Sequence, residues 1–482
     1  MPGPAAASGN AMQKTAVIFG LALSTLVGAL LLAPRMKAPD PPKPTPPRPT
    51  PTATSPVTEL VYADDTLAVT ARLDRGYVQA GSDEPLWMDV AIKATGVQTH
   101  APLTAILVVD RSGSMAGDKI DGARMAAERF VNGLRDGDQL GVITFGTDVT
   151  TELPLTAIDG ASRARALRAV RNIEEGGGTN IDGGMLAARR MLDSADLMGR
   201  VARVVLLSDG RPTEGDRRES TLAGHAATLR EHGITTSTLG LGLDYNEDLM
   251  ERMAVDGGGR YHYLRHANQL AQILDNELQQ GAAVIAAGAR LFFPSGGVVE
   301  VLDAPGARVD RGGSQVSIDV GDLAAGEERH VLVKLHAGNV ADVAQFGAPE
   351  ITYKKAGQST QALLAHRADP FRVFGTTDLA QLDSSRRDDV RVRVLQVEAS
   401  LALTASMQDY ARGDATGAQR RLAEKKAELG AMAAKTKNIA LAAEAENFDH
   451  VLQSVAAAPA PASEAQQDMI KEQKARAFTL RR

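Results

Sequence analysis

The regular alternation of apolar strands and helices between Leu103 and Gln280 constrains the fold of this chain most. Helical segments, such as the apolar stripe over Ile120–Leu134, separate apolar runs that have the composition of buried strands. Those runs are Ile106–Val109, Leu140–Phe145, Val204–Leu207 and Thr235–Leu241. The pattern predicts a doubly wound α/β domain, and sheets of this kind bind ligands beyond the carboxyl ends of their strands.

Three polar motifs fall at or near such strand ends. They are Asp110-Arg-Ser112-Gly-Ser114, Gly176-Gly-Gly-Thr179-Asn180 and Leu207-Ser208-Asp209-Gly210. Together they supply two carboxylates and three hydroxyls, which are the oxygen ligands that a hard divalent cation prefers. Because an octahedral ion has six positions, five donors leave at least one position for water or an outside ligand. We therefore expect a single Mg²⁺ site, with Mn²⁺ or Ca²⁺ as substitutes.

The three motifs, in this order, resemble the metal-ion-dependent adhesion site of von Willebrand factor type A (VWA) domains. All five positions of that site are matched, by Asp110, Ser112, Ser114, Thr179 and Asp209. The resemblance implies that the first four coordinate directly or through water and that Asp209 acts through water. It also implies that the vacant position takes a Glu or Asp carboxylate from a protein partner. The likeness continues through Asp244-Tyr-Asn-Glu-Asp-Leu and Gly257-Gly-Gly-Arg-Tyr, over about 180 residues in all.

Alternating apolar and polar residues on both sides of this domain predict half-buried strands. Leu67–Leu73 and Met88–Ile92 precede it, and Val298–Leu302, Val316–Val320 and Val331–Leu335 follow it. We expect these flanks to form one β-sandwich in which the Rossmann-like VWA domain is an insertion. The arrangement resembles bacterial membrane-anchored proteins of this class.

The N-terminus carries the evidence for location. Thr15–Pro34 holds twenty uncharged residues, enough for a helix of about 30 Å that spans a bilayer. The alternative is a cleaved signal peptide with a site at Val27-Gly28-Ala29. Ten of the 22 prolines follow between Pro34 and Pro56 and predict an extended linker. We expect a single-pass anchor in a bacterial inner membrane, with the bulk of the chain in the periplasm.

Beyond Asp388 the apolar period becomes helical, with Val390, Val394, Val397 and Leu401 on one stripe. A break at Gly413-Asp414 predicts a second helix, and a third extends to about Val455. The Ala/Pro-rich and charged end is expected to be disordered. The predicted boundaries are a tail at 1–14, an anchor at 15–34, a linker at 35–56, strands at 57–100, the VWA domain at 101–281, the rest of the sandwich at 282–375, helices at 376–455 and a disordered tail at 456–482.

Composition narrows the possible functions. The chain has no cysteine, which excludes disulfides, thiolate metal sites and a cysteine nucleophile. Its 53 basic and 59 acidic residues give a net charge of −6 without a basic stripe, so nucleic acid is not an expected partner. The glycines at 176–178 are not followed by Gly-Lys-Ser/Thr, so nucleotide binding is not expected either.

Three functions are compatible with the sequence. The first is a metal-dependent adhesion or scaffold module at a membrane surface, without catalytic residues. The second is a cofactor subunit for a ring-shaped ATPase, which requires a cytosolic location. The third is a metal-dependent hydrolase, although no His, Lys or Cys within the motifs is placed as an evident general base.

Overall fold

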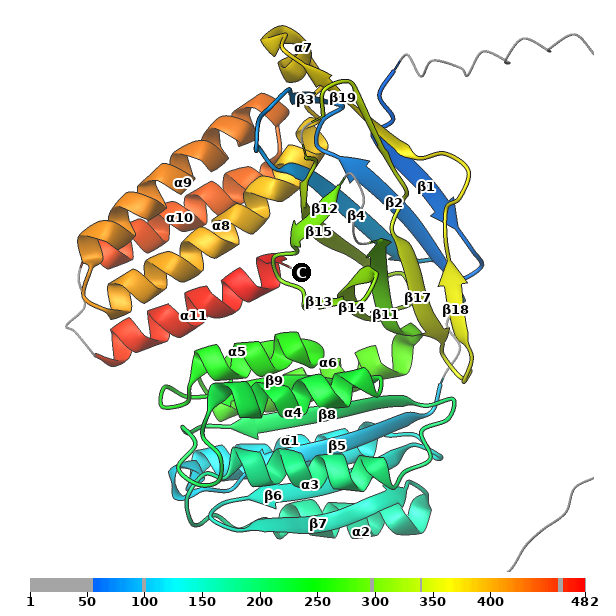
Figure 1. Ribbon diagram of the computed structural model, residues 1–482. Helices are drawn as coiled ribbons and strands as arrows, with labels where there is room; N and C mark the ends of the chain where they lie inside the picture. The colour runs from blue at the N-terminus through cyan, green and yellow to red at the C-terminus, as the bar shows by residue number, and fades with distance from the viewer. Residues whose placement is uncertain (1–54, 98–100, 295–298, 339, 458–462, 482) are drawn as a thin grey trace, which may run out of the picture. The chain divides into compact units, whose positions relative to one another are not determined.

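The computed structural model describes residues 55–481 except 98–100, 295–298, 339 and 458–462 (Figure 1). The predicted anchor at Thr15–Pro34 and almost all of the proline-rich linker lie outside the described residues and stay predictions. Within the described part of the chain, no helix is both long and apolar enough to cross a membrane.

The central α/β domain is built on a six-stranded sheet in the order β10-β9-β8-β5-β6-β7. Five strands run parallel, and β7 pairs antiparallel with β6. The strands are β5 (Leu103–Asp110), β6 (Gln139–Phe145), β7 (Val149–Ala157), β8 (Val201–Ser208), β9 (Ile234–Leu241) and β10 (Gly258–Leu264). The central strands β5, β8 and β9 are buried along their whole length, as their apolar runs predict.

Helices cover both faces of this sheet, so the doubly wound arrangement is confirmed. The helices are α1 (Asp118–Gly133), α2 (Gly160–Arg171), α3 (Ile181–Asp193), α4 (Glu219–Glu231), α5 (Glu247–Asp256) and α6 (Leu270–Ala283), with short 3-10 turns η1 (Gly113–Met115) and η2 (Ala267–Gln269). One core layer joins α1, α2 and α6 to the sheet, and the other joins α3, α4 and α5 to it.

Strands from both flanks of the central domain build one β-sandwich, as predicted. Its first sheet has the order β1-β2-β4-β15-β12 and its second β13-β14-β11-β17-β18; a small third sheet has the order β16-β19-β3. The strands before the central domain are β1 (Glu59–Ala63), β2 (Leu67–Leu73), β3 (Tyr77–Gln79) and β4 (Leu86–Ala94). Those after it are β11 (Val284–Pro294), β12 (Glu300–Asp303), β13 (Val309–Gly312), β14 (Gln315–Ala324), β15 (Glu328–His336), β16 (Val343–Phe346), β17 (Glu350–Lys355), β18 (Gln361–Leu364) and β19 (Phe371–Thr376). A single apolar core lies between the two large sheets.

Buried charges join the central domain to the sandwich. Arg230 at the end of α4 is 2% exposed and donates hydrogen bonds of 2.7 to 3.0 Å to Asp319 of β14. Thr235 Oγ1 donates to Asp322 on the same strand at 2.7 Å. Burial opposes the charge on Arg230, but the Asp319 carboxylate outweighs it and raises the pKa of Arg230. Because an unpaired charge is costly to bury, these pairs specify how the two parts meet.

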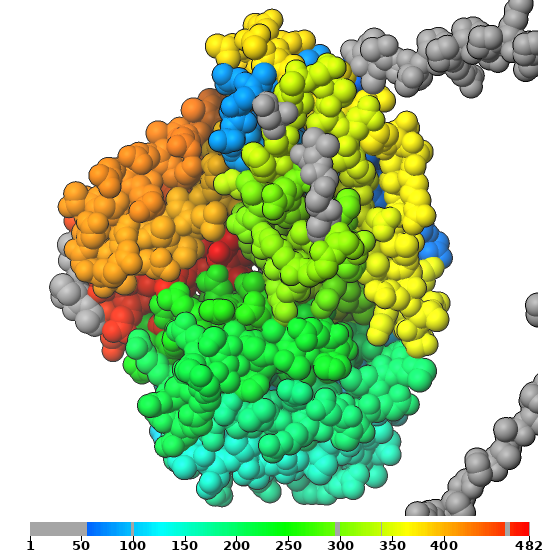
Figure 2. Space-filling view, viewed as in Figure 1, coloured from blue at the N-terminus to red at the C-terminus, as the bar shows by residue number. Residues whose placement is uncertain are grey.

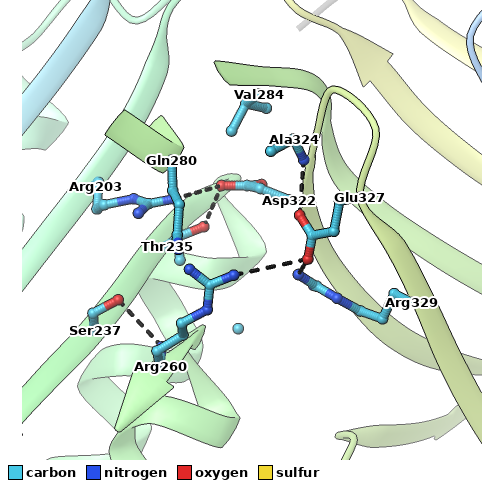
Figure 3. A pocket seen from close by; sticks show the side chains of 12 residues that line it. Arg203, Thr235, Ser237, Arg260, Gln280, Val284, Asp322, Ala324, Glu327 and Arg329 are labelled. Carbon is cyan, nitrogen blue, oxygen red and sulfur yellow. Dashed lines mark hydrogen bonds and ion pairs between the residues drawn. The ribbon is translucent and has the colours of Figure 1, made fainter. Parts of the chain in front are cut away.

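Figure 3 shows the neighbouring part of this seam, where Arg203, Arg260 and Arg329 converge on Asp322 and Glu327. Arg260 lies 3.8 Å from Glu327, and Arg203 lies 4.0 Å from Asp322. The cavity between these side chains measures only about 20 Å³, so the seam has no room for a ligand larger than water.

The C-terminal helical region contains α7 (Leu379–Ser384), α8 (Asp388–Ala411), α9 (Ala415–Thr436) and α10 (Ile439–Ala456). The predicted break at Gly413-Asp414 is the turn between α8 and α9, and Asp414 caps α9 by accepting from Gly417 N at 2.8 Å. Val390, Val394 and Val397 of α8 pack with Leu332 of β15, against which Trp87 of β4 also packs. Helix α8 therefore packs on the outer face of the first sheet of the sandwich.

The prediction of a disordered tail at 456–482 is wrong for most of that segment. Residues Glu464–Arg481 form a final helix, α11, which packs against α8 and the central domain (Figure 1; Figure 2). Phe478 lies in the same core layer as Tyr261 of β10. The charged composition of this segment predicts disorder. In the structure, however, the buried charges of α11 pair with opposite charges of the central domain, and composition alone carries no information about such pairs.

Two lysines of α11 carry this contact. Lys471 Nζ donates to the Tyr245 carbonyl at 2.8 Å and to Glu247 at 2.7 Å, and it lies 3.9 Å from the centre of the Tyr245 ring. Lys474 Nζ donates to Glu247 at 3.0 Å and to Asp248 at 2.8 Å. Burial alone would raise the pKa of Glu247, but Lys471 and Lys474 lower it to about 2.

We therefore predict that Lys471→Met loosens α11. The change leaves the Tyr245 carbonyl without its ammonium donor, at a cost of about 1–3 kcal/mol, so amide exchange over residues 464–481 should accelerate. The depressed pKa of Glu247 means that its stabilising contribution is complete above about pH 4.5 and is lost as the pH falls toward 2. Exchange protection factors of α11 should fall over the same pH range. Lys435→Met, which removes an exposed ion pair with Asp388, is the control. Equal protection of α11 in both variants would contradict this role of Lys471.

Candidate metal centre

The first predicted motif leaves the end of β5 as a tight turn. Asp110 is fully buried at the last position of the strand, and its Oδ1 accepts from Ser112 N at 2.8 Å. The turn then enters η1, which brings Ser112 Oγ and Ser114 Oγ to 3.0 Å from each other. The backbone thus presents one carboxylate and two hydroxyls within a single turn.

The third motif lies beside the first because β8 is the parallel neighbour of β5. Asp209, fully buried, follows the last residue of β8, and its Oδ1 accepts from Ser114 Oγ at 2.7 Å. Ser208 Oγ donates to Asp110 Oδ2 at 2.6 Å. The two strand ends are therefore joined by direct hydrogen bonds between their side chains.

The second motif places Thr179 just before α3, where it is 4% exposed. A Cβ atom built on Gly210 would lie 3.2 Å from Thr179 Oγ1 and 3.6 Å from Ser114 Oγ. The loop is held by Gly113 N donating to Gly177 O at 3.0 Å, and by Thr179 N donating to Thr213 Oγ1 at 2.8 Å. The structure thus brings all five predicted side chains to one place.

Burial dominates the electrostatics of Asp110. Loss of solvent is the largest effect and the Asp209 carboxylate acts in the same direction, so the pKa of the Asp110 carboxyl rises to about 6 although the hydrogen bonds from Ser208 and Ser112 act to lower it. Two carboxylates that share one desolvated place repel each other, so a cation between them is stabilising.

This donor set fits a small hard cation. Ser112, Ser114, Thr179 and the two carboxylates offer only oxygen, and the absence of a side chain on Gly210 leaves the space beside Thr179 and Ser114 open. Among the described residues, no group of three or more His, Cys, Asp or Glu side chains could hold a metal. A site composed mainly of hydroxyls is outside that class, and it suits Mg²⁺ better than a soft metal.

Sequence reasoning missed two residues of this centre. Ser208 stands inside a predicted motif, but its role in orienting Asp110 depends on the register between β5 and β8. Lys119 Nζ lies 2.5 Å from Asp209 Oδ2, although the two residues are 90 positions apart. In the sequence, the indication of this contact is that Lys119 lies at the start of the helix that follows the Asp110 motif.

Other charged residues near the motifs lie outside the donor cluster. Asp118 and Asp121 occupy the first turn of α1, where their negative charges interact favourably with the positive end of the helix dipole. His262 lies 3.2 Å from the buried Glu277 and contacts none of the five donors.

Comparison with known proteins identifies the fold of the central domain. Residues 106–276 match the family model of the von Willebrand factor type A domain. This segment is a VWA domain. Domains of this family typically mediate protein–protein interaction or adhesion.

The curated relatives are similar over part of their length. Human inter-alpha-trypsin inhibitor heavy chain H4 is 30% identical over 211 residues, which are 42% of this chain and 22% of that protein. The uncharacterized protein YfbK of Escherichia coli is 27% identical over 258 residues, 52% of this chain and 44% of that protein. The chain therefore spans less than half the length of either relative.

Two solved structures share the fold beyond the VWA domain. A von Willebrand factor type A protein from Catenulispora acidiphila aligns with a TM-score of 0.64 at 18% identity, covering 84% of this chain and 90% of that one. The ArnB paralog VWA2 from Sulfolobus acidocaldarius aligns with a TM-score of 0.58 at 17% identity, covering 86% and 99%.

The geometry of Gly210 leads to a direct test. Gly210→Ala places a methyl group 3.2 Å from Thr179 Oγ1, which narrows the space between the donors, so we predict at least about tenfold weaker Mn²⁺ binding by calorimetry. The backbone accepts the change, because Gly210 is not among the described glycines with positive φ. Gly224→Ala in α4 meets no atom within 4 Å and is the matched control. Unchanged Mn²⁺ affinity in Gly210→Ala would exclude this space as the metal position.

Proposed function

We propose that this protein is a binding protein whose VWA domain holds one divalent cation and, through it, an acidic group of a partner protein. The convergence of Asp110, Ser112, Ser114, Thr179 and Asp209 carries the proposal. The cation would be Mg²⁺, with Mn²⁺ or Ca²⁺ as substitutes, and its chemistry would be to accept an outside oxygen ligand.

The protein's own residues define this role in three ways. Burial of Asp110 and Asp209 concentrates negative charge where only a cation can offset it. The hydrogen bonds from Ser208 and Ser112 N hold the Asp110 carboxylate in one orientation. The exposed Ser114 leaves the outer side of the centre accessible, and the exposed Arg211, which follows Asp209-Gly210, places a positive charge on its rim. An acidic side chain of a partner is the ligand that suits such a rim.

Hydrolysis is less well supported than binding. A metal-dependent hydrolase needs a general base close to the water that it activates. Among the described residues, the hydrogen bonds that involve a side chain connect the five donors to one another and to Ser208, Thr213 and Lys119, and none of these bonds involves a histidine. The proposal therefore assigns no catalytic residue.

The decisive variant is Asp110→Ala. Calorimetry of the full chain with MgCl₂ and MnCl₂ should give one bound ion for the wild type and no measurable binding for Asp110→Ala, because the variant loses an anionic donor. Thr179→Ala should retain weakened binding, since it loses a neutral donor only. Asp244→Ala removes an exposed carboxylate in the neighbouring β9–α5 loop and should behave like the wild type.

A pulldown then tests recognition of a partner. Proteins captured by the wild type in Mg²⁺ should be lost both in EDTA and with Asp110→Ala, and retained with Asp244→Ala. Capture that persists in EDTA and with Asp110→Ala would show that the metal centre is not the interface.

A further inference from the structure

Lys119 shares a carboxylate with the metal centre. It is the second residue of α1, and its ammonium donates to Asp209 Oδ2 at 2.5 Å. The other oxygen of that carboxylate, Oδ1, accepts from Ser114 Oγ at 2.7 Å. The Asp209 carboxylate therefore contacts Ser114, a predicted metal donor, through Oδ1 and the positively charged Lys119 through Oδ2.

This ammonium changes the charge of the centre. Asp110 and Asp209 are fully buried, and in the described chain Lys119 is the cationic side chain that pairs with either of them. The pair reduces the net charge of the two carboxylates from −2 to −1. A divalent ion beside the same carboxylates is repelled by the ammonium, because both are cations in a place of low effective dielectric constant.

Lys119 also has space to move away. Its side chain is 30% exposed and borders a groove of about 880 Å³ along α1. Asp118, Asp121 and Glu128 line the same groove and offer carboxylates on the solvent side. A Cβ built on Gly242 would lie 3.6 Å from both Cε and Nζ of Lys119, so the β9–α5 loop lies beside the ammonium and leaves the side toward the groove for movement.

We propose that Lys119 is an internal counter-cation of the metal centre, which stabilises the buried Asp209 without metal and lowers the affinity for divalent ions. The inference rests on the proposed function, because it requires that the five donors bind a cation. Lys119, which is not one of the five donors, would then lower the affinity of the centre for divalent ions. An anionic ligand from a partner then compensates the excess positive charge, so metal and partner bind cooperatively.

Calorimetry with MnCl₂ and MgCl₂ on the full chain tests the inference. Lys119→Met removes the charge and keeps an unbranched side chain, so the dissociation constant of both ions should fall at least about tenfold. Lys119→Arg retains the charge and should bind like the wild type. Lys354→Met, at an exposed lysine of β17 far along the chain from the motifs, is the control and should also match the wild type.

Thermal unfolding supplies a second measurement that separates a counter-cation from a residue that only positions Asp209. Without metal, Lys119→Met should melt at a lower temperature than the wild type, since Asp209 is left buried without its cation. Saturating Mg²⁺ should then raise the melting temperature of Lys119→Met more than that of the wild type.

The outcomes are distinct. Tighter ion binding by Lys119→Met, together with the larger gain in melting temperature, supports the inference. If the wild type binds metal and Lys119→Met binds it equally or more weakly, the inference fails and the proposed function stands. If neither protein binds either ion, the proposed function fails and the inference fails with it.

Discussion

The pairing of β4 with β15 is the constraint on which the rest of the structure depends. Eight residue pairs, from Leu86↔Leu335 to Lys93↔Glu328, join strands that lie on opposite sides of the VWA domain in the sequence. The chain leaves the first sheet after β4 and returns in the second sheet at β11, and a Cβ built on Gly96 would lie 3.3 Å from Ile285 Cδ1, so the VWA domain begins and ends at one end of the sandwich. The pairing also creates the surface that α8 covers through Val390, Val394 and Val397. Sandwich, inserted domain and C-terminal helices therefore depend on contacts that are distant in sequence.

Two clusters of buried charge in this protein have opposite roles. At the seam between the VWA domain and the sandwich, four guanidinium groups face four carboxylates, so the charges balance and specify one geometry. They belong to Arg203, Arg230, Arg260 and Arg329 and to Glu277, Asp319, Asp322 and Glu327. At the proposed metal centre, Asp110 and Asp209 carry two negative charges and, among the described residues, one ammonium contacts them, so one negative charge is not compensated. The charges of the first cluster are neutralised by residues of the chain itself, whereas a bound cation would neutralise the remaining negative charge of the second. This difference is why we assign structure to one cluster and binding to the other.

Much of the fold and the five-donor cluster could be predicted from the sequence, because both follow from local patterns. The alternation of apolar and polar residues in Leu67–Leu73 corresponds to the alternation of buried and partly exposed residues in β2. The motifs at Asp110 and Asp209 lie together because the parallel strands β5 and β8 end at the same edge of the sheet. Lys119 and α11 were not predictable in the same way. The ion pair of Lys119 with Asp209 and those of Lys471 and Lys474 with Glu247 join residues 90 or more positions apart. Composition cannot distinguish such buried charges from those of a solvated or disordered segment.

The most direct test of the account is a crystal structure of the full chain soaked in Mn²⁺, with anomalous scattering used to locate the metal. The account predicts one strong anomalous peak among Ser112, Ser114, Thr179, Asp110 and Asp209, and its loss in crystals of Asp110→Ala. A strong Mn²⁺ peak elsewhere, with the Lys119–Asp209 ion pair intact and no metal beside the five donors, would contradict the account.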